Sequence, residues 1–237
     1  MIGGTAMSIR IGLAMLQGAR HEHGQALMAA AEELGVETEL ICLRTPADLT
    51  EKIDGLVLPG GESTTMRIAS KHQGLLVELF QWIKENPKKP VMGTCAGAIL
   101  MCEPPNGNAA LISAQLSRNS WGRQVDSFQA PLQVEIGSTI DYPISGTRVI
   151  TDESHLPLKL NNGSQGDAKS FPGVFIRAPR FESLGNAEII AQFNDEVVGV
   201  REGRRIALTF HPELTFDRRF HRWLLECAMD NLQGDVQ

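Results

Sequence analysis

The sequence lacks the features that mark membrane, secreted and nucleic-acid-binding proteins. No window approaches about 18 consecutive apolar residues, so no segment is expected to span a bilayer. The first residues lack a charged segment followed by an apolar one, so no secretory signal is expected. Lys and Arg total 22 against 28 Asp and Glu, and a net charge of −6 gives no attraction to nucleic acid or anionic lipid. These absences predict a cytoplasmic protein that binds small polar substrates or other proteins.

Cysteines with paired spacing are also missing. The four cysteines, at positions 42, 95, 102 and 227, form no C-x-x-C pair and are too sparse for a disulfide scaffold. We therefore expect free thiols in a reducing compartment, one of which is a candidate for reactivity. His21-Glu22-His23 offers ligand-type side chains, but no further His or Cys follows at a credible spacing. We interpret this tripeptide as a solvated helix start and predict neither a metal nor a cofactor.

Strand-like and helix-like segments alternate along the first half of the chain. Short apolar runs end in turn residues, and segments with helical spacing of Ala and Leu follow them. This alternation predicts an α/β fold with a mostly parallel sheet covered by helices. The predicted strands are Ile9–Leu16, Val36–Leu43, Gly55–Leu58 and Pro90–Gly93, and the predicted helices are Gln25–Leu34, Leu75–Lys84 and Ala96–Met101.

The second half of the chain has short, closely spaced β-like segments, which predict antiparallel strands added at one sheet edge. Residues 138–170 are rich in Gly, Asn, Ser, Asp and Pro, and we interpret them as an insertion loop. No linker divides the chain, so we predict an extension over residues 1–8, a single domain over 9–233 and a tail over 234–237. The β-like segments are Leu132–Ile136, Arg148–Ile150, Val174–Arg177, Glu188–Phe193 and Val197–Val200, and a closing amphipathic helix is predicted over Thr215–Leu232.

The strongest local signal for chemistry is the pentapeptide G-T-C-A-G at residues 93–97. It lies between an apolar strand and an apolar helix, and it has the form of a nucleophile elbow with Cys95 as nucleophile. A helix N-terminus favours a thiolate, and the amide of Ala96 is placed to donate to an oxyanion. The alternative is a buried cysteine in a glycine-rich turn.

A second signal is the H-P-E sequence at residues 211–213, which follows a β-like run. His211 is therefore expected at the carboxyl end of a strand, where α/β sheets place their sites. Pro212 favours an extended conformation at the residue before it, and extended residues two apart point the same way. We expect Glu213 to orient His211, as the base of a cysteine nucleophile requires. The alternative is a histidine in a turn beside a solvated glutamate.

A glycine pair at residues 60–61 follows a third predicted strand end. Two glycines allow backbone amides to approach a ligand or to flip, so this turn is a candidate for a second oxyanion donor. Ser63 or Thr64 is placed to cap a following helix. The segment is not a P-loop, because no Lys follows at the required spacing.

Together these motifs resemble the triad-type (class I) glutamine amidotransferases, whose glutaminase domain carries Cys, His and Glu on a flavodoxin-like fold. The order along the chain fits, since α/β hydrolases place the acid before the histidine. Four further segments resemble the glutaminase subunits of pyridoxal 5'-phosphate synthase, and the matches run from about Ile9 to the last helix. These segments are L-Q-G at 16–18, L-P-G-G-E-S-T-T-M at 58–66, R-N-S-W-G-R-Q-V-D-S-F at 118–128 and G-V-F-I-R-A-P at 173–179.

The resemblance implies a three-layer flavodoxin-like sandwich with antiparallel edge additions, and it assigns residues 9–233 to a glutaminase domain. It implies a catalytic triad of Cys95, His211 and Glu213 that hydrolyses L-glutamine through a γ-glutamyl thioester. The amides of Gly61 and Ala96 are implied as the oxyanion hole. The implied substrate contacts are Gly61, Glu62, Ser63, Arg118, Ile176 and Arg177, with surface ion pairing as the alternative for the two arginines.

The resemblance also implies a partner. Ammonia released into water near neutral pH is mostly protonated, so a synthase must receive it directly. In the family this synthase is a (β/α)8 barrel that builds pyridoxal 5'-phosphate, and about twelve glutaminase subunits surround about twelve synthase subunits. The rival readings are a partner-independent γ-glutamyl hydrolase of the same fold, a non-catalytic interaction subunit, and an amidotransferase that serves another pathway.

Overall fold

We analysed a computed structural model, which describes residues 8–16, 20–61, 63, 66, 68, 74–118, 127–137 and 170–234. Within these residues the strands form one nine-stranded sheet and one two-stranded sheet. The strands are β1 (Ile9–Ala14), β2 (Thr38–Leu43), β3 (Gly55–Leu58), β4 (Val91–Thr94), β5 (Gln115–Ser117), β6 (Ser127–Val134), β7 (Ser170–Ile176), β8 (Arg180–Ser183), β9 (Glu188–Phe193), β10 (Glu196–Glu202) and β11 (Arg205–Leu208). The α-helices are α1 (Arg20–Leu34), α3 (Leu75–Glu85), α4 (Ala96–Cys102) and α5 (Arg219–Gly234), and the 3-10 turns are η1 (Pro46–Asp48), η2 (Pro105–Gly107) and η3 (Pro212–Leu214).

Five parallel strands form one half of the large sheet, in the order β2-β1-β3-β4-β11. Each neighbouring pair in this half is parallel. With β11 as the fifth parallel strand, this is the 2-1-3-4-5 order of flavodoxin-like folds. The predicted fold class is confirmed.

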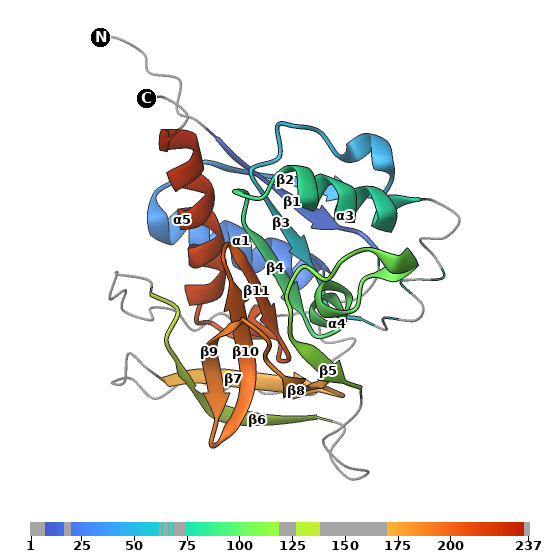
Figure 1. Cartoon of the computed structure of the whole chain (residues 1–237). Coiled ribbons are helices and arrows are strands. Elements are labelled where there is room, and N and C mark those ends of the chain that lie inside the picture. The colour runs from blue at the N-terminus through green and yellow to red at the C-terminus, as the bar shows by residue number, and fades with distance from the viewer. Residues whose placement is uncertain are drawn as a thin grey trace.

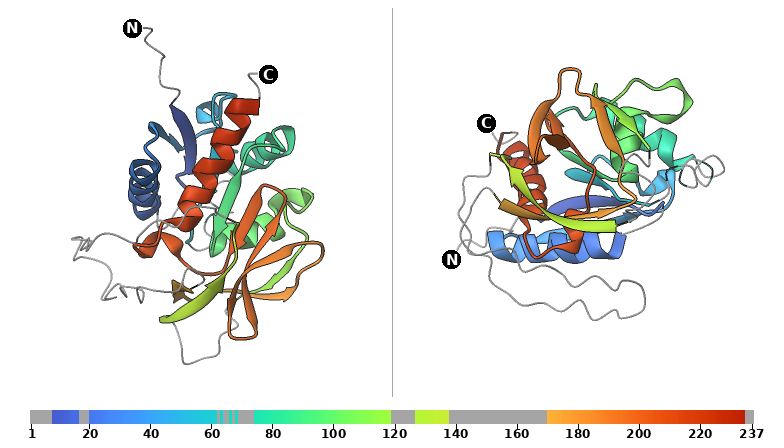
Figure 2. Two further views of the ribbon diagram at one scale, coloured as in Figure 1. Left: turned by 90° about the vertical axis from the view of Figure 1, so that its left-hand side faces the viewer. Right: turned by 90° about the horizontal axis from the view of Figure 1, so that it is seen from below.

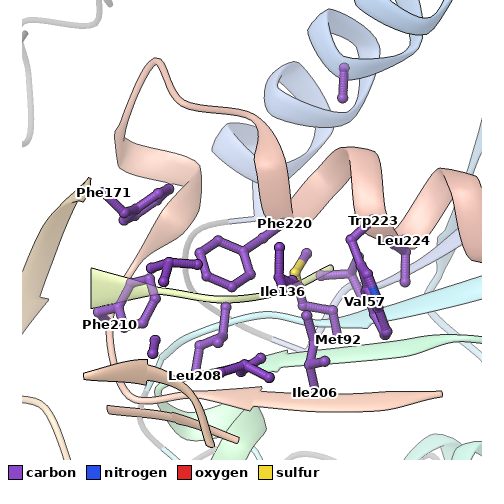
Figure 3. Packing of buried hydrophobic residues seen from close by; sticks show 14 of the residues in the cluster. Val57, Met92, Ile136, Phe171, Ile206, Leu208, Phe210, Phe220, Trp223 and Leu224 are labelled. Atoms are coloured by element: carbon purple, nitrogen blue, oxygen red, sulfur yellow. The ribbon is translucent and has the colours of Figure 1, made fainter. Parts of the chain in front are cut away.

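Helices cover both faces of the parallel half, α1 and α5 on one side and α3 and α4 on the other (Figure 1). The left view of Figure 2 shows α1 and α5 side by side in front of the sheet. Side chains alternate between the two layers: Val57 packs toward α5, whereas Leu56 and Leu58 pack toward α3 and α4. Such two-sided burial explains why these strands appear in the sequence as continuous apolar runs. In Figure 3, Phe220, Trp223 and Leu224 of α5 lie over Val57, Met92, Ile206 and Leu208 of the sheet.

The other half of the large sheet is antiparallel, in the order β11-β10-β9-β6-β7, as predicted for the second half of the chain. Of these strands, β6, β7, β9 and β10 lie at the bottom of Figure 1. The strand predicted from Leu132 begins earlier, at Ser127, and includes Pro131. Proline fits there because β6 pairs with β9 only at Gln133 and Val134. No residue of β9 lies opposite Pro131, so no hydrogen bond on that side requires a backbone N–H from it.

The closing helix begins four residues later than predicted, at Arg219 rather than at Thr215. The Asp217 carboxylate accepts a hydrogen bond from the backbone N–H of Arg219 at 3.0 Å, as an N-terminal cap does. Most of the predicted extension, insertion and tail, and the β-like segment 148–150, lie outside the described residues. In the part that the structure describes, no helix is long and apolar enough to cross a membrane.

Candidate active site

Three neighbouring parallel strands end at the candidate site. β3, β4 and β11 lie side by side, with Leu58 level with Gly93 and Thr94 level with Leu208. The residues that follow β4 and β11 therefore emerge together, and the N–H of Cys95 donates to the Leu208 carbonyl at 2.8 Å. This arrangement places the two strongest sequence motifs beside each other, as the carboxyl-end rule for α/β sheets predicts.

Cys95 adopts the strained backbone of a nucleophile elbow, with φ 48° and ψ −105°. A non-glycine residue rarely adopts a positive φ, and the strain is held by tight packing on both sides. A Cβ on Gly93 would lie 2.4 Å from Met101 Sδ, and a Cβ on Gly97 would lie 1.9 Å from the Leu58 carbonyl oxygen. The small residues expected on either side of the cysteine are therefore required by space, and the predicted sharp turn from strand to helix is present at Cys95.

His211 and Glu213 meet as predicted, with Nδ1 of the imidazole 2.7 Å from Oε1 of the carboxylate. The local backbone differs from the prediction: the chain does not stay extended through Glu213 but enters the 3-10 turn η3 directly after His211. The contact forms because the tight turn folds the carboxylate back toward the imidazole. His211 is 6% exposed and Glu213 is 1% exposed, so the pair is withdrawn from water.

Burial and charge oppose each other at this pair. Burial by itself would lower the pKa of His211, but the Glu213 charge and hydrogen bonding with Cys95 and Glu213 outweigh it and raise the pKa to about 10. Burial by itself would raise the pKa of Glu213, but His23 and His211 lower it. Cys95 is close enough to raise the pKa of His211. Nevertheless, Nε2 of His211 has no partner at full hydrogen-bond geometry. The arrangement favours an imidazolium that lies beside a carboxylate and close to the Cys95 thiol.

His23 is a member of this site that the sequence interpretation missed. The tripeptide at 21–23 was expected to be a solvated helix start, and that holds for His21, which is exposed. It is wrong for His23, which is fully buried, because α1 packs its first turn against η3. Nε2 of His23 lies 3.3 Å from Glu213 Oε2 and 3.1 Å from Thr94 Oγ1, and Nδ1 lies 3.1 Å from Nε2 of His221.

One candidate oxyanion donor, Ala96, directly follows the cysteine, and the other, Gly61, follows Gly60, whose Cβ would lie 3.4 Å from Cys95 Cβ. Ala96 is the first residue of α4 and is 1% exposed, so its N–H belongs to the helix turn that lacks intrahelical acceptors. Gly61 has φ 150°, which glycine adopts freely. A Cβ on Gly60 would lie 2.7 Å from His211 Cε1, so this turn passes directly beside the imidazole.

The structure brings some of the candidate substrate contacts close to Cys95, but not all of them. The Cys95 thiol lies 4.0 Å from the Ile176 carbonyl oxygen, and Arg177 follows with φ 42°, a strained value for a large side chain. Ser63 is buried, and Glu62 lies outside the described residues. Arg118 Nη2 lies 3.5 Å from Glu103 Oε2, as its alternative reading predicted, but side chains 40% and 45% exposed form only a weak ion pair.

The buried histidines make a prediction for stability against pH. Burial lowers the pKa of His23 and of His221 below the ordinary 6.5. Below pH 6.5 the unfolded chain therefore binds protons at these histidines that the folded chain does not bind. We expect the free energy of unfolding to fall as the pH drops from about 6.5 to 5, by up to about 1.4 kcal/mol per pH unit for each histidine. His211, whose pKa is raised, is protonated in both states below 6.5 and adds no slope there.

Urea unfolding at a series of pH values measures this slope. The variant His221→Gln should show a clearly shallower decline than the wild type over the same window. An equal decline in both proteins would contradict the assignment of a buried neutral His221.

A family model for the SNO glutamine amidotransferase family matches residues 13–149 and 154–230. The chain is 39% identical to the pyridoxal 5'-phosphate synthase subunit PdxT of Thermococcus onnurineus, over 93% of this chain and 100% of that protein. It is 37% identical to the subunit of the same name from Oenococcus oeni, over 95% and 100%. A crystal structure of a glutamine amidotransferase matches with a TM-score of 0.67 and 34% identity, over 92% of this chain and 98% of that one. The chain therefore belongs to the SNO glutamine amidotransferase family.

Proposed function

We propose that this chain is the glutaminase subunit of a pyridoxal 5'-phosphate synthase, and that Cys95, His211 and Glu213 are its catalytic triad. The observation that carries the proposal is the buried His211–Glu213 pair, joined at 2.7 Å and set beside a cysteine on a strained elbow. The relatives that match this chain over nearly their whole length are named as subunits of that synthase.

In the proposed reaction the Cys95 sulfur attacks the side-chain carboxamide carbon of L-glutamine. The carbonyl π bond opens, and the oxyanion is held by the amides of Ala96 and Gly61. His211 protonates the departing nitrogen, the C–N bond breaks, and ammonia leaves behind a γ-glutamyl thioester. His211 then takes a proton from water, which attacks the thioester, and glutamate and the free thiol are regenerated. Glu213 keeps the imidazole oriented and stabilises its charged form.

The rest of the substrate is assigned to the residues around the elbow. L-glutamine carries an α-carboxylate and an α-ammonium group, which need charged or polar partners. An arginine holds a carboxylate through two parallel hydrogen bonds. If the substrate carboxylate replaces Glu103 as the partner of Arg118, little free energy is lost, because the exposed Arg118–Glu103 ion pair contributes only about 0–1 kcal/mol. The proposed substrate contacts are Gly61, Glu62, Ser63, Arg118, Ile176 and Arg177.

The proposed partner is a (β/α)8-barrel synthase, with about twelve subunits of each kind in the complex. Ammonia that escaped into water would be protonated and lost as a nucleophile, so direct transfer to the partner is required. Its docking is proposed to set the Gly60-Gly61 turn and so complete the oxyanion hole. The four cysteines lie outside any disulfide, which agrees with a cytoplasmic location.

Glutamate release from L-glutamine tests this proposal. The chain is assayed alone and with a barrel-type synthase subunit, with Cys95→Ala as the blank. We expect strong stimulation by the synthase and no release by Cys95→Ala in either condition. Equal release without the partner would instead support an independent hydrolase, and silence in both conditions would support an interaction subunit. Either result would overturn the proposal.

A further inference from the structure

A line of buried polar side chains continues behind Glu213, away from Cys95. His23 comes from α1, His221 from α5 and Thr94 from the end of β4, and all three are 0% exposed. His221 Nε2 lies 3.1 Å from His23 Nδ1, and His23 Nε2 lies 3.3 Å from Glu213 Oε2. Elements separated by nearly the whole chain thus join to present an imidazole to the carboxylate oxygen that His211 does not use.

The contacts favour one arrangement of the protons. If His23 carries its proton on Nε2, an N–H faces the Glu213 carboxylate and Thr94 Oγ1, and Nδ1 accepts from the Nε2–H of His221. The opposite tautomer would set a lone pair of His23 against the carboxylate. It would also require His221 to keep its proton on Nδ1, which is buried without a hydrogen-bond partner. A buried donor without an acceptor is costly, so the first arrangement is preferred.

The charges around the two histidines agree with neutral rings. Glu22 and Glu213 favour a charge on His23, but burial and the neighbouring His211 outweigh them and lower its pKa. His221 is faced by Arg218, Arg222 and His23, and these together with burial lower its pKa well below the ordinary value. Both rings therefore act through N–H groups and lone pairs, and the negative charge of Glu213 remains available to His211.

We propose that His23 is a positioning residue of the glutaminase reaction: its Nε2–H holds the second oxygen of Glu213, and His221 fixes the tautomer that makes this possible. The inference rests on the proposed function, because it assigns Glu213 the task of orienting His211. Oε2 of Glu213 is buried without a partner at full hydrogen-bond geometry, and the His23 N–H is a side-chain donor within reach, at 3.3 Å. Contacts of this kind tighten when the substrate complex forms.

The tautomer is tested first, without any need for activity. Nitrogen NMR of the 15N-histidine-labelled chain distinguishes protonated from unprotonated ring nitrogens, and His23→Gln and His221→Gln assign the two signals. We expect both histidines to be neutral with the proton on Nε2 over about pH 6 to 8. A proton on Nδ1 of His23 would overturn the proposal.

Kinetics with the synthase present test the role. His23→Leu removes the donor at similar volume, and we expect kcat to fall about 10- to 100-fold, as for other residues that orient a reacting group from behind. KM for glutamine should not change, because His23 does not touch the substrate. A carboxylate that loses a donor has a raised pKa, so the acidic limb of the pH profile should move to higher pH.

Two further variants separate this role from packing. His23→Gln places an amide N–H where the imidazole has Nε2, and it should recover most of the lost kcat and restore the acidic limb. Leu27→Ala, one turn along α1 and fully buried, should lower the unfolding temperature but leave kcat and the pH profile unchanged. The proposal fails if His23→Leu behaves like Leu27→Ala, or if His23→Gln is no better than His23→Leu. Failure of the proposed function is distinct, since the wild-type complex would then release no glutamate.

Discussion

Replacement of Glu213 by glutamine is expected to lower kcat about 10³- to 10⁴-fold, the scale known for a triad acid changed to its amide. The carboxylate accepts from His211 through one oxygen and faces His23 with the other, at 2.7 and 3.3 Å. An amide offers only one accepting oxygen, so its NH2 group must oppose an N–H of either His211 or His23. The imidazole then loses its orientation or its tautomer, and the imidazolium loses the charge that stabilises it.

Glutamate release by the complex measures the effect, with kcat and KM determined separately. Because Glu213 is not assigned to substrate binding, KM should change little. Glu188→Gln is the matched control: its carboxylate is 67% exposed and pairs with Arg201 on the surface, so this variant should retain wild-type kcat. A Glu213→Gln enzyme within about tenfold of wild type would contradict the assigned triad acid.

The strained turn at Cys95 and the His211–Glu213 contact were accessible from the sequence because the residues that define each of them are neighbours in the chain. Cys95 lies between small residues at a strand-to-helix junction. Gly93 and Gly97 pack so tightly against their neighbours that a larger side chain would not fit at either position. His211 and Glu213 are two residues apart, so their contact depends on one turn. Even there the sequence predicted the contact but not its geometry, since η3 rather than an extended chain brings the side chains together.

His23 was not accessible in the same way, because its role depends on contacts between residues about 190 positions apart. A charged tripeptide at a helix start is usually solvated, and His21 follows that rule. Only the packing of α1 against η3 and α5 buries His23. The start of β6 shows the same limit: Pro131 argues against a strand in the sequence, and only the offset pairing with β9 makes it acceptable.

Replacement of Gly97 by alanine is expected to destabilise the protein by more than about 4 kcal/mol, a loss reserved for severe packing conflicts. The new Cβ would lie 1.9 Å from the Leu58 carbonyl oxygen and 2.7 Å from the Leu58 carbonyl carbon. Both atoms belong to the backbone of β3, which is buried between its neighbours β1 and β4, so neither can swing aside as a flexible side chain would. To relieve the conflict, α4 must move away from the sheet and carry Cys95 with it.

Thermal unfolding measures this loss, which should lower the midpoint by at least about 8 °C for a chain of this size. Gly24→Ala is the matched control, since Gly24 also lies in a helix but its Cβ would meet only the end of the Leu40 side chain, at 3.4 Å. There alanine should stabilise α1 by up to about 1 kcal/mol. If both variants kept the wild-type midpoint, the close approach of α4 to β3 would be wrong. Because that approach holds the elbow in its strained conformation, the strain at Cys95 and the stability of the fold depend on the same contact.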